Sequence, residues 1–203
     1  MPIPSSHRLR DEACKHATLD WRKSVSAAVQ IIDPWYAAQA YAWCGRFAPP
    51  SDSPQLLNLS FRKADDGKDI YQRVAATAWP LRALVELGYH EKAKMKFASV
   101  AETSLQTMTC SSRAEACFLV FQAIAIAPQP LAQIAFEWLR TGLNPPTHWR
   151  QRRALEEGLL QAVSLGLIQV GQLDSFADHA LVERVTKRTE RGETAYPRTF
   201  FWS

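Results

Sequence analysis

The chain has 203 residues, of which 47% are hydrophobic and 22% are charged. A chain of this length and apolar content can bury a sizeable core, so the composition excludes intrinsic disorder and predicts a single domain over residues 1–203. The net charge of +4 is a mild excess that favours an acidic partner, and it falls short of the dense basic stripe typical of a dedicated nucleic-acid binder.

Hydrophobic residues recur at helical spacing along almost the whole chain, and no segment shows the sustained alternation typical of a strand. Only residues 56–61 hint at a strand. The sequence therefore predicts an all-α fold of about four antiparallel helical hairpins. The helices are expected over residues 10–32, 35–47, 69–88, 90–107, 112–127, 130–142, 147–166 and 170–190.

Proline and glycine positions divide this pattern into parts. Pro49, Pro50 and Pro54, with the Asp66-Gly67 turn, predict one long irregular connection. The expected organisation is an N-terminal helical hairpin over residues 1–50, the irregular connection over 51–68, repeat units over 69–191 and a C-terminal tail over 192–203.

An internal repeat becomes visible when the chain is compared with itself at a shift of about 40 residues. Arg73, Arg113 and Arg153 then stand at the same position in three segments, and hydrophobic residues that follow them fall in register. Each segment is followed by a second predicted helix. This pattern predicts a two-helix repeating unit.

The predicted unit over residues 84–101 resembles a tetratricopeptide repeat, because Gly88, Ala93 and Phe97 match its turn and second helix. The period of about 40 and Pro80 inside the first helix are more similar to HEAT or armadillo repeats. The resemblance covers residues 69–191. It implies a short right-handed α-solenoid that presents a concave surface to a protein partner, without implying a particular ligand.

Residues with catalytic or metal-binding potential show no productive spacing. The five histidines are scattered, and the pair Cys14 and His16 offers two ligands where zinc needs about four. Phosphate-binding glycine loops and nucleophile elbows are missing from the sequence. Glu156 and Glu157 follow Arg152 and Arg153 by four residues, a spacing that favours ion pairing. We therefore expect no enzymatic activity, and no catalytic, cofactor or metal-binding residue.

The most distinctive charged segment is residues 148–153, at the start of the seventh predicted helix. Trp149 offers a stacking face, and Arg150, Arg152 and Arg153 could bind phosphates or an acidic partner. Positive charge at a helix N-terminus opposes the helix dipole, which favours a binding role. The alternative is a solvated helix face with Trp149 in the core.

The chain ends with three adjacent aromatic residues, Phe200, Phe201 and Trp202. Because such a patch is unfavourable in water, the tail either packs back onto the last helices or docks onto another molecule. The second possibility leaves a homodimer open.

The first functional hypothesis is a non-enzymatic protein–protein interaction module. Its surface would be formed by the first helices of the repeat units, around Arg73, Arg82, Arg113 and Arg152. An immunity or antitoxin protein that occludes a toxin is one specific form of this hypothesis.

The alternative is a nucleic-acid-binding protein. It would use Arg150, Arg152 and Arg153, and it requires the cations of the last helix to converge on the same face. Those cations are Lys187, Arg188 and Arg191.

The sequence also bears on the cellular location of the protein, because it lacks the apolar segments of a secretory signal or a membrane span. The N-terminal residues contain no apolar run that a secretory signal would need. The apolar segment over residues 116–127 is shorter than the roughly 20 residues that cross a bilayer. The sequence therefore predicts a cytoplasmic protein without a membrane partner.

Overall fold

The computed structural model describes residues 5–103, 105–175, 178–196 and 201–202. These residues form α-helices and two short 3-10 helices, with no β-strand among them, so the all-α prediction is confirmed. The elements are α1 (Ser6–Ala17), α2 (Trp21–Ala28), α3 (Pro34–Phe47), α4 (Ser53–Asp65), α5 (Ile70–Ala76), α6 (Ala78–Glu86), α7 (His90–Ala101), η1 (Leu105–Thr107), α8 (Cys110–Ile124), α9 (Gln129–Leu143), α10 (Trp149–Ser164), η2 (Val170–Ser175) and α11 (His179–Glu190).

The prediction of one long helix over residues 10–32 is wrong, because the chain turns between α1 and α2. The Asp20 side chain accepts hydrogen bonds from the backbone N–H groups of Arg22 and Lys23, and so begins α2 as its N-cap. The buried Ser24 hydroxyl donates to the Ala13 carbonyl oxygen at 2.7 Å, which fixes α2 against α1.

The irregular connection expected over residues 51–68, and the strand hint within it, are also wrong. Helix α4 occupies most of this segment and packs against α3. Pro54 lies in the first turn of α4, where a proline lacks only an N–H that has no partner within the helix. The buried face includes Leu57 and Phe61, four residues apart, and the Ser60 hydroxyl donates to the Ala38 carbonyl oxygen at 2.6 Å.

The helix predicted over residues 69–88 is divided into α5 and α6 at Thr77. The Thr77 hydroxyl donates to the Val74 carbonyl oxygen at 2.6 Å, and Pro80 lies in the first turn of α6. Gly88 has a φ of +77°, and the Tyr89 N–H donates to the Leu84 carbonyl oxygen at 2.8 Å, as in a Schellman motif. The predicted turn at Gly88 therefore lies where α6 leads into α7.

The other predicted helices are present in the structure, and their ends differ by a few residues from the predicted ends. The helix expected over residues 90–107 is α7 followed by η1, with residue 104 outside the described residues. The helix expected over 170–190 is η2 followed by α11, and residues 176–177 lie outside the described residues. Asp178 is the N-cap of α11, because its side chain accepts a hydrogen bond from the Leu181 N–H at 3.0 Å.

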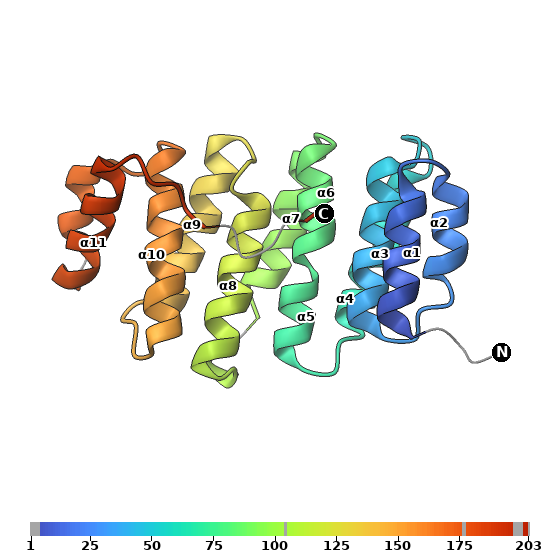
Figure 1. The fold of residues 1–203 in the computed structure, drawn as a ribbon, viewed down its shortest axis with the longest axis horizontal. Coiled ribbons are helices and arrows are strands. Elements are labelled where there is room, and N and C mark those ends of the chain that lie inside the picture. The colour runs from blue at the N-terminus through green and yellow to red at the C-terminus, as the bar shows by residue number, and fades with distance from the viewer. Residues whose placement is uncertain (1–4, 104, 176–177, 197–200, 203) are drawn as a thin grey trace.

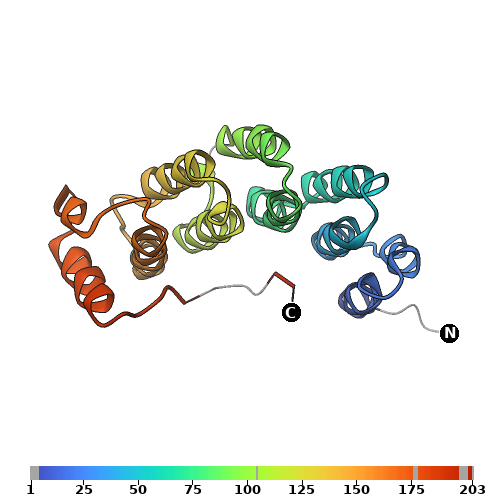
Figure 2. The same ribbon diagram turned by 90° about the horizontal axis from the view of Figure 1, so that it is seen from above.

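Figure 1 shows the helices side by side in chain order along the long axis, from α1 and α2 at one end to α11 at the other. Seen from above, they form two rows (Figure 2). We call α1, α3, α5, α6, α8 and α10 the first row, and α2, α4, α7 and α9 the second row. The core lies between the rows: one hydrophobic cluster extends from α3 to α11, and a smaller cluster joins α1 to α4.

Candidate partner-binding surface

The C-terminal residues pack against the first row in the middle of the chain. Figure 2 shows the C-terminus beside the central helices of that row, well away from α11. Phe201 is only 6% exposed and belongs to the main core cluster. Its contacts, and those of Trp202, are with α3 and α6. The expectation that the tail packs on the last helices is therefore wrong for these two residues; Phe200 lies outside the described residues.

Phe201 contacts two side chains of α6. Its ring meets the Trp79 ring edge to face, with centroids 5.6 Å apart and an interplanar angle of 71°. The Arg82 guanidinium carbon lies 5.6 Å from the centroid of the Phe201 ring. Edge-to-face ring pairs and cation–π contacts both stabilise such an arrangement beyond the burial of apolar surface.

Trp202 makes directional contacts with both α3 and α6. Its ring is perpendicular to that of Trp43, with centroids 5.3 Å apart, and the Arg46 guanidinium carbon lies 4.8 Å from its centroid. The indole Nε1–H donates to Glu86 Oε1 at 2.9 Å. We call the surface formed by Trp43, Arg46, Trp79, Arg82 and Glu86 the aromatic seat.

Glu86 is the polar centre of the aromatic seat. Arg46 Nε donates to one carboxylate oxygen at 2.5 Å, and Arg82 Nε donates to the other at 2.6 Å. Burial raises the pKa of Glu86, but hydrogen bonds from Arg82, Trp202 and Arg46 outweigh this effect and lower the pKa below its ordinary value. The carboxylate is therefore ionised at neutral pH.

Among the seven residues expected to bind a partner, only Arg82 belongs to the aromatic seat. Besides its contacts with Glu86 and Phe201, its Nη1 donates to the Gln122 carbonyl oxygen of α8 at 3.4 Å. Arg113 is largely structural, since its Nη2 donates to the carbonyl oxygens of Gln106 and Met108 and holds the segment around η1.

Arg73 is exposed and lines two clefts beside α5. The larger cleft, about 350 Å³, lies between the start of α5 and the segment joining η1 to α8, and Tyr71 and Ser112 are among its lining residues. The smaller, about 110 Å³, lies between α5 and the end of α7, and it is also lined by Asp65. Arg73 is thus available to a partner, although it does not belong to the aromatic seat.

The predicted cluster at the start of α10 is split by ion pairing. Arg152 Nε donates to Asp178 Oδ2 at 3.0 Å, whereas Arg150 and Arg153 are exposed and have no carboxylate partner among the described residues. Trp149 is 59% exposed, so the alternative that placed it in the core is wrong. The Arg150 guanidinium carbon lies 5.2 Å from its ring centroid.

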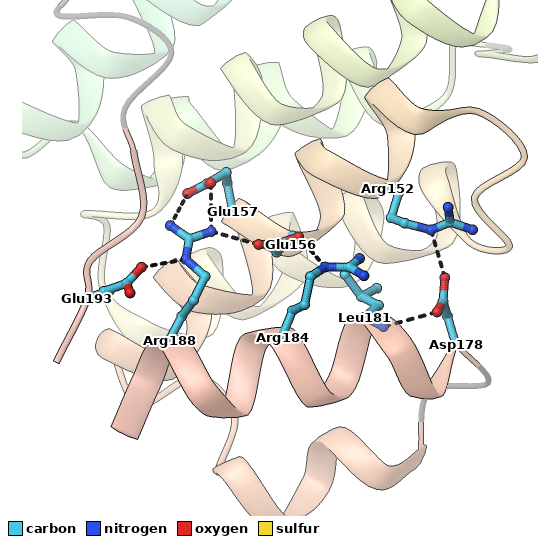
Figure 3. A network of polar contacts seen from close by, with 8 residues as sticks. All are labelled: Arg152, Glu156, Glu157, Asp178, Leu181, Arg184, Arg188 and Glu193. Atoms are coloured by element: carbon cyan, nitrogen blue, oxygen red, sulfur yellow. Dashed lines mark hydrogen bonds and ion pairs between the residues drawn. The ribbon is translucent and has the colours of Figure 1, made fainter. Parts of the chain in front are cut away.

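Of the three cations expected to join this cluster, Arg188 is held by carboxylates in the interface of α10 and α11 (Figure 3). Arg188 bonds Glu156, Glu157 and Glu193, and Arg184 bonds Glu156. Lys187 is paired with Glu183 at 2.6 Å, and Arg191 lies 3.8 Å from Glu193. The glutamates at 156 and 157 therefore form ion pairs, as expected, but with α11 rather than along α10. This network reduces the positive charge available to phosphates.

Two cysteines are buried in the helical core. Burial raises the pKa of the Cys44 thiol to about 11 and that of Cys117 to about 12, so both are protonated at neutral pH. Within the described part of the chain, no three metal-binding side chains gather at one point. No described helix has the length and apolar character that crossing a bilayer requires.

The residues of the aromatic seat other than Arg82 were not singled out by the sequence as binding residues. Trp43 belongs to an aromatic run in α3, and Phe201 and Trp202 to the terminal aromatic run, but neither run indicates its contact with the other. No family model matches the chain, and comparisons with curated proteins and with solved structures gave no significant match.

Proposed function

We propose that the protein is a non-enzymatic protein–protein interaction module, built as a short right-handed α-solenoid, that binds its partner on the first row of helices. The observation that carries this proposal is the aromatic seat, because α3 and α6 already hold two side chains of the C-terminal tail through aromatic, cationic and hydrogen-bond contacts. Interfaces concentrate binding energy in aromatic and arginine side chains of this kind.

Charge supports an acidic partner. Arg73, Arg150 and Arg153 are exposed on first-row helices and unpaired among the described residues, and the chain has a net charge of +4. Such cations steer an acidic protein toward the surface. Occlusion of a toxin by an immunity or antitoxin-type inhibitor is the specific role that we propose within this class.

Binding to nucleic acid is the second candidate, and the exposed Trp149 flanked by Arg150 favours it. An indole face beside a guanidinium can stack on a base and pair with a phosphate. It remains second because carboxylates hold Arg152, Arg188 and Lys187.

A capture experiment separates the two candidates. The purified full chain would be incubated with nuclease-treated and untreated lysate of its host, beside Arg150→Ala/Arg153→Ala and the control Arg62→Ala/Lys94→Ala, which removes two exposed cations from second-row helices. We expect one protein to be captured after nuclease treatment, and to be reduced at least fivefold by the first-row variant only. Capture that nuclease abolishes would contradict the proposal and support the second candidate.

A further inference from the structure

We propose that the aromatic seat is a peptide-binding site for a partner segment with two adjacent large aromatic residues, and that Phe201 and Trp202 occupy it in cis until that segment displaces them. This inference rests on the proposed function, because it names the partner's chemistry and the regulation of the same first-row surface. The C-terminal residues show which ligand the seat accepts.

The contacts select for a tryptophan beside a second aromatic ring. Glu86 accepts a hydrogen bond from the indole N–H at 2.9 Å, which a phenylalanine at the same place could not donate. Trp43 and Trp79 present separate rings, each meeting one of the two aromatic side chains. The seat thus combines two ring contacts with one polar contact that fixes orientation, as small recognition sites do.

The seat can persist when the tail leaves it. Helices α3 and α6 pack directly against each other, and Arg46 from α3 and Arg82 from α6 hold the two oxygens of Glu86 without help from the tail. Two guanidiniums face one carboxylate, so the vacant seat carries a net positive charge. A partner segment with acidic residues beside its aromatic pair fits this charge best.

Among its described residues, the tail is held at separate points, so a competing segment can displace its aromatic end. The described residues 193–196 have no regular structure; the Tyr196 N–H donates to Glu157 Oε2 at 2.7 Å, while Tyr196 itself is 62% exposed. Glu193 also bonds Arg188, and Ala195 packs against the main hydrophobic cluster. Beyond Tyr196, the described contacts of the tail are those of Phe201 and Trp202 in the seat.

The tail is covalently joined to the helices that form the seat, and about 1 mM is the order of magnitude of the effective concentration for a short tether. An intrinsic dissociation constant of about 10 µM would then make the closed seat about 100 times as populated as the open seat.

The test uses a fluorescein-labelled peptide with the sequence of residues 193–203 and the full-length chain. Phe201→Ala/Trp202→Ala vacates the seat, and Tyr196→Ser is the matched control that removes an exposed aromatic residue of the same tail. Fluorescence anisotropy should show that the double variant binds the peptide at least tenfold, and by the estimate above about 100-fold, more tightly than the wild type and the control do.

A second probe tests the hydrogen bond to Glu86. A peptide with 1-methyltryptophan at position 202 keeps the ring but lacks the indole N–H, and it should bind the double variant several-fold more weakly. Circular dichroism confirms folding of each variant, and Trp202→Ala alone replaces the double variant if that protein does not fold.

Two results would overturn the inference. One is equal or undetectable peptide binding by the wild type and a folded vacated variant. The other is a wild-type dimer, seen by analytical ultracentrifugation, that Phe201→Ala/Trp202→Ala dissociates, because the seat would then hold the tail of a second copy.

Failure of the inference and failure of the proposed function are distinguishable by repeating the lysate capture with the vacated variant. Increased capture of the same protein supports both. Equal capture by the wild type and the vacated variant supports the proposed function and overturns the inference, whereas peptide binding without any captured protein supports the seat and contradicts the proposed function.

Discussion

Glu86 joins the polar contacts of the aromatic seat. Its side chain is 17% exposed, and it accepts hydrogen bonds from Arg46, Arg82 and Trp202. Charged acceptors with several donors are costly to alter because each donor loses a charge-assisted partner. The identity of this residue therefore affects both the stability of the fold and the docking of the C-terminal tail.

We predict that Glu86→Gln lowers the free energy of unfolding by about 1–3 kcal/mol at pH 7, since the amide keeps the shape but loses the charge. The folded-state pKa of Glu86 lies below its ordinary value of 4.5. The carboxylate therefore stabilises the fold above about pH 4.5, and this contribution is lost as the pH falls through the folded-state pKa.

Thermal unfolding between pH 3 and pH 8 tests this prediction. The difference in melting temperature between the wild type and Glu86→Gln should shrink as the pH falls below about 4.5. Glu190→Gln is a suitable control because Glu190 is exposed and has no ion-pair partner among the described residues. A constant difference over the whole pH range would contradict an ionised Glu86.

The exposed binding candidates differ in how far the sequence could identify them. Arg150 and Arg153 are accessible as expected, because a charged residue away from the apolar stripe of a helix usually faces solvent. Arg113 and Arg152 are engaged with Met108 and Asp178, respectively. The pairing of Arg152 depends on which helices become neighbours, and local spacing carries no information about that. Arg113 instead bonds a carbonyl oxygen only five residues earlier, which comes within reach through the turn around η1.

Packing between helices depends on close approach at particular positions. A Cβ added at Gly158 of α10 would overlap the side chain of Leu139. Leu139 belongs to α9 and is fully buried. Gly171 in η2 offers a contrast, because an added Cβ there meets nothing within 4 Å. The spacing of α9 and α10 therefore requires glycine at position 158.

We predict that Gly158→Ala lowers the free energy of unfolding by about 1–3 kcal/mol despite the higher helix propensity of alanine. Propensity favours alanine by about 1 kcal/mol, but the added methyl would overlap Leu139 Cδ2, and the fully buried Leu139 side chain cannot turn out into solvent. Urea denaturation should show this loss for Gly158→Ala and a change of less than about 0.5 kcal/mol for Gly171→Ala. Stabilisation by Gly158→Ala would mean that α9 and α10 separate more easily than their packing indicates.

The existence of most helices follows from sequence periodicity, whereas their ends depend on single residues. Prolines at positions 49, 50 and 54 favour a loop when considered without their context, yet Pro54 lies in the first turn of α4. Asp20 begins α2 as an N-cap within an almost continuous helical pattern. Thr77 divides α5 from α6 in a different way, because its hydroxyl donates back to the Val74 carbonyl oxygen and Pro80 follows in the first turn of α6.

At the scale of the whole molecule, the C-terminal tail connects the end of the chain to its middle. The contact between Trp202 and Trp43 joins residues far apart in sequence. Aromatic composition predicts that such a tail must be covered, but it does not identify the covering surface. That surface depends on the arrangement of α3 and α6 in the first row, which only the three-dimensional structure provides.

The tail should also stabilise the whole fold, because a ligand that binds only the folded state shifts the unfolding equilibrium. If the occupied seat is about 100 times as populated as the vacant seat, binding of the tail contributes about 2.7 kcal/mol to the free energy of unfolding. Phe201→Ala/Trp202→Ala should therefore lower the free energy of unfolding by about 2–3 kcal/mol. Urea denaturation measures this loss. Saturating peptide with the sequence of residues 193–203 should restore much of it in the double variant and change the wild type little. A loss that the peptide cannot restore would mean that the two aromatic side chains are a fixed part of the core rather than a displaceable ligand.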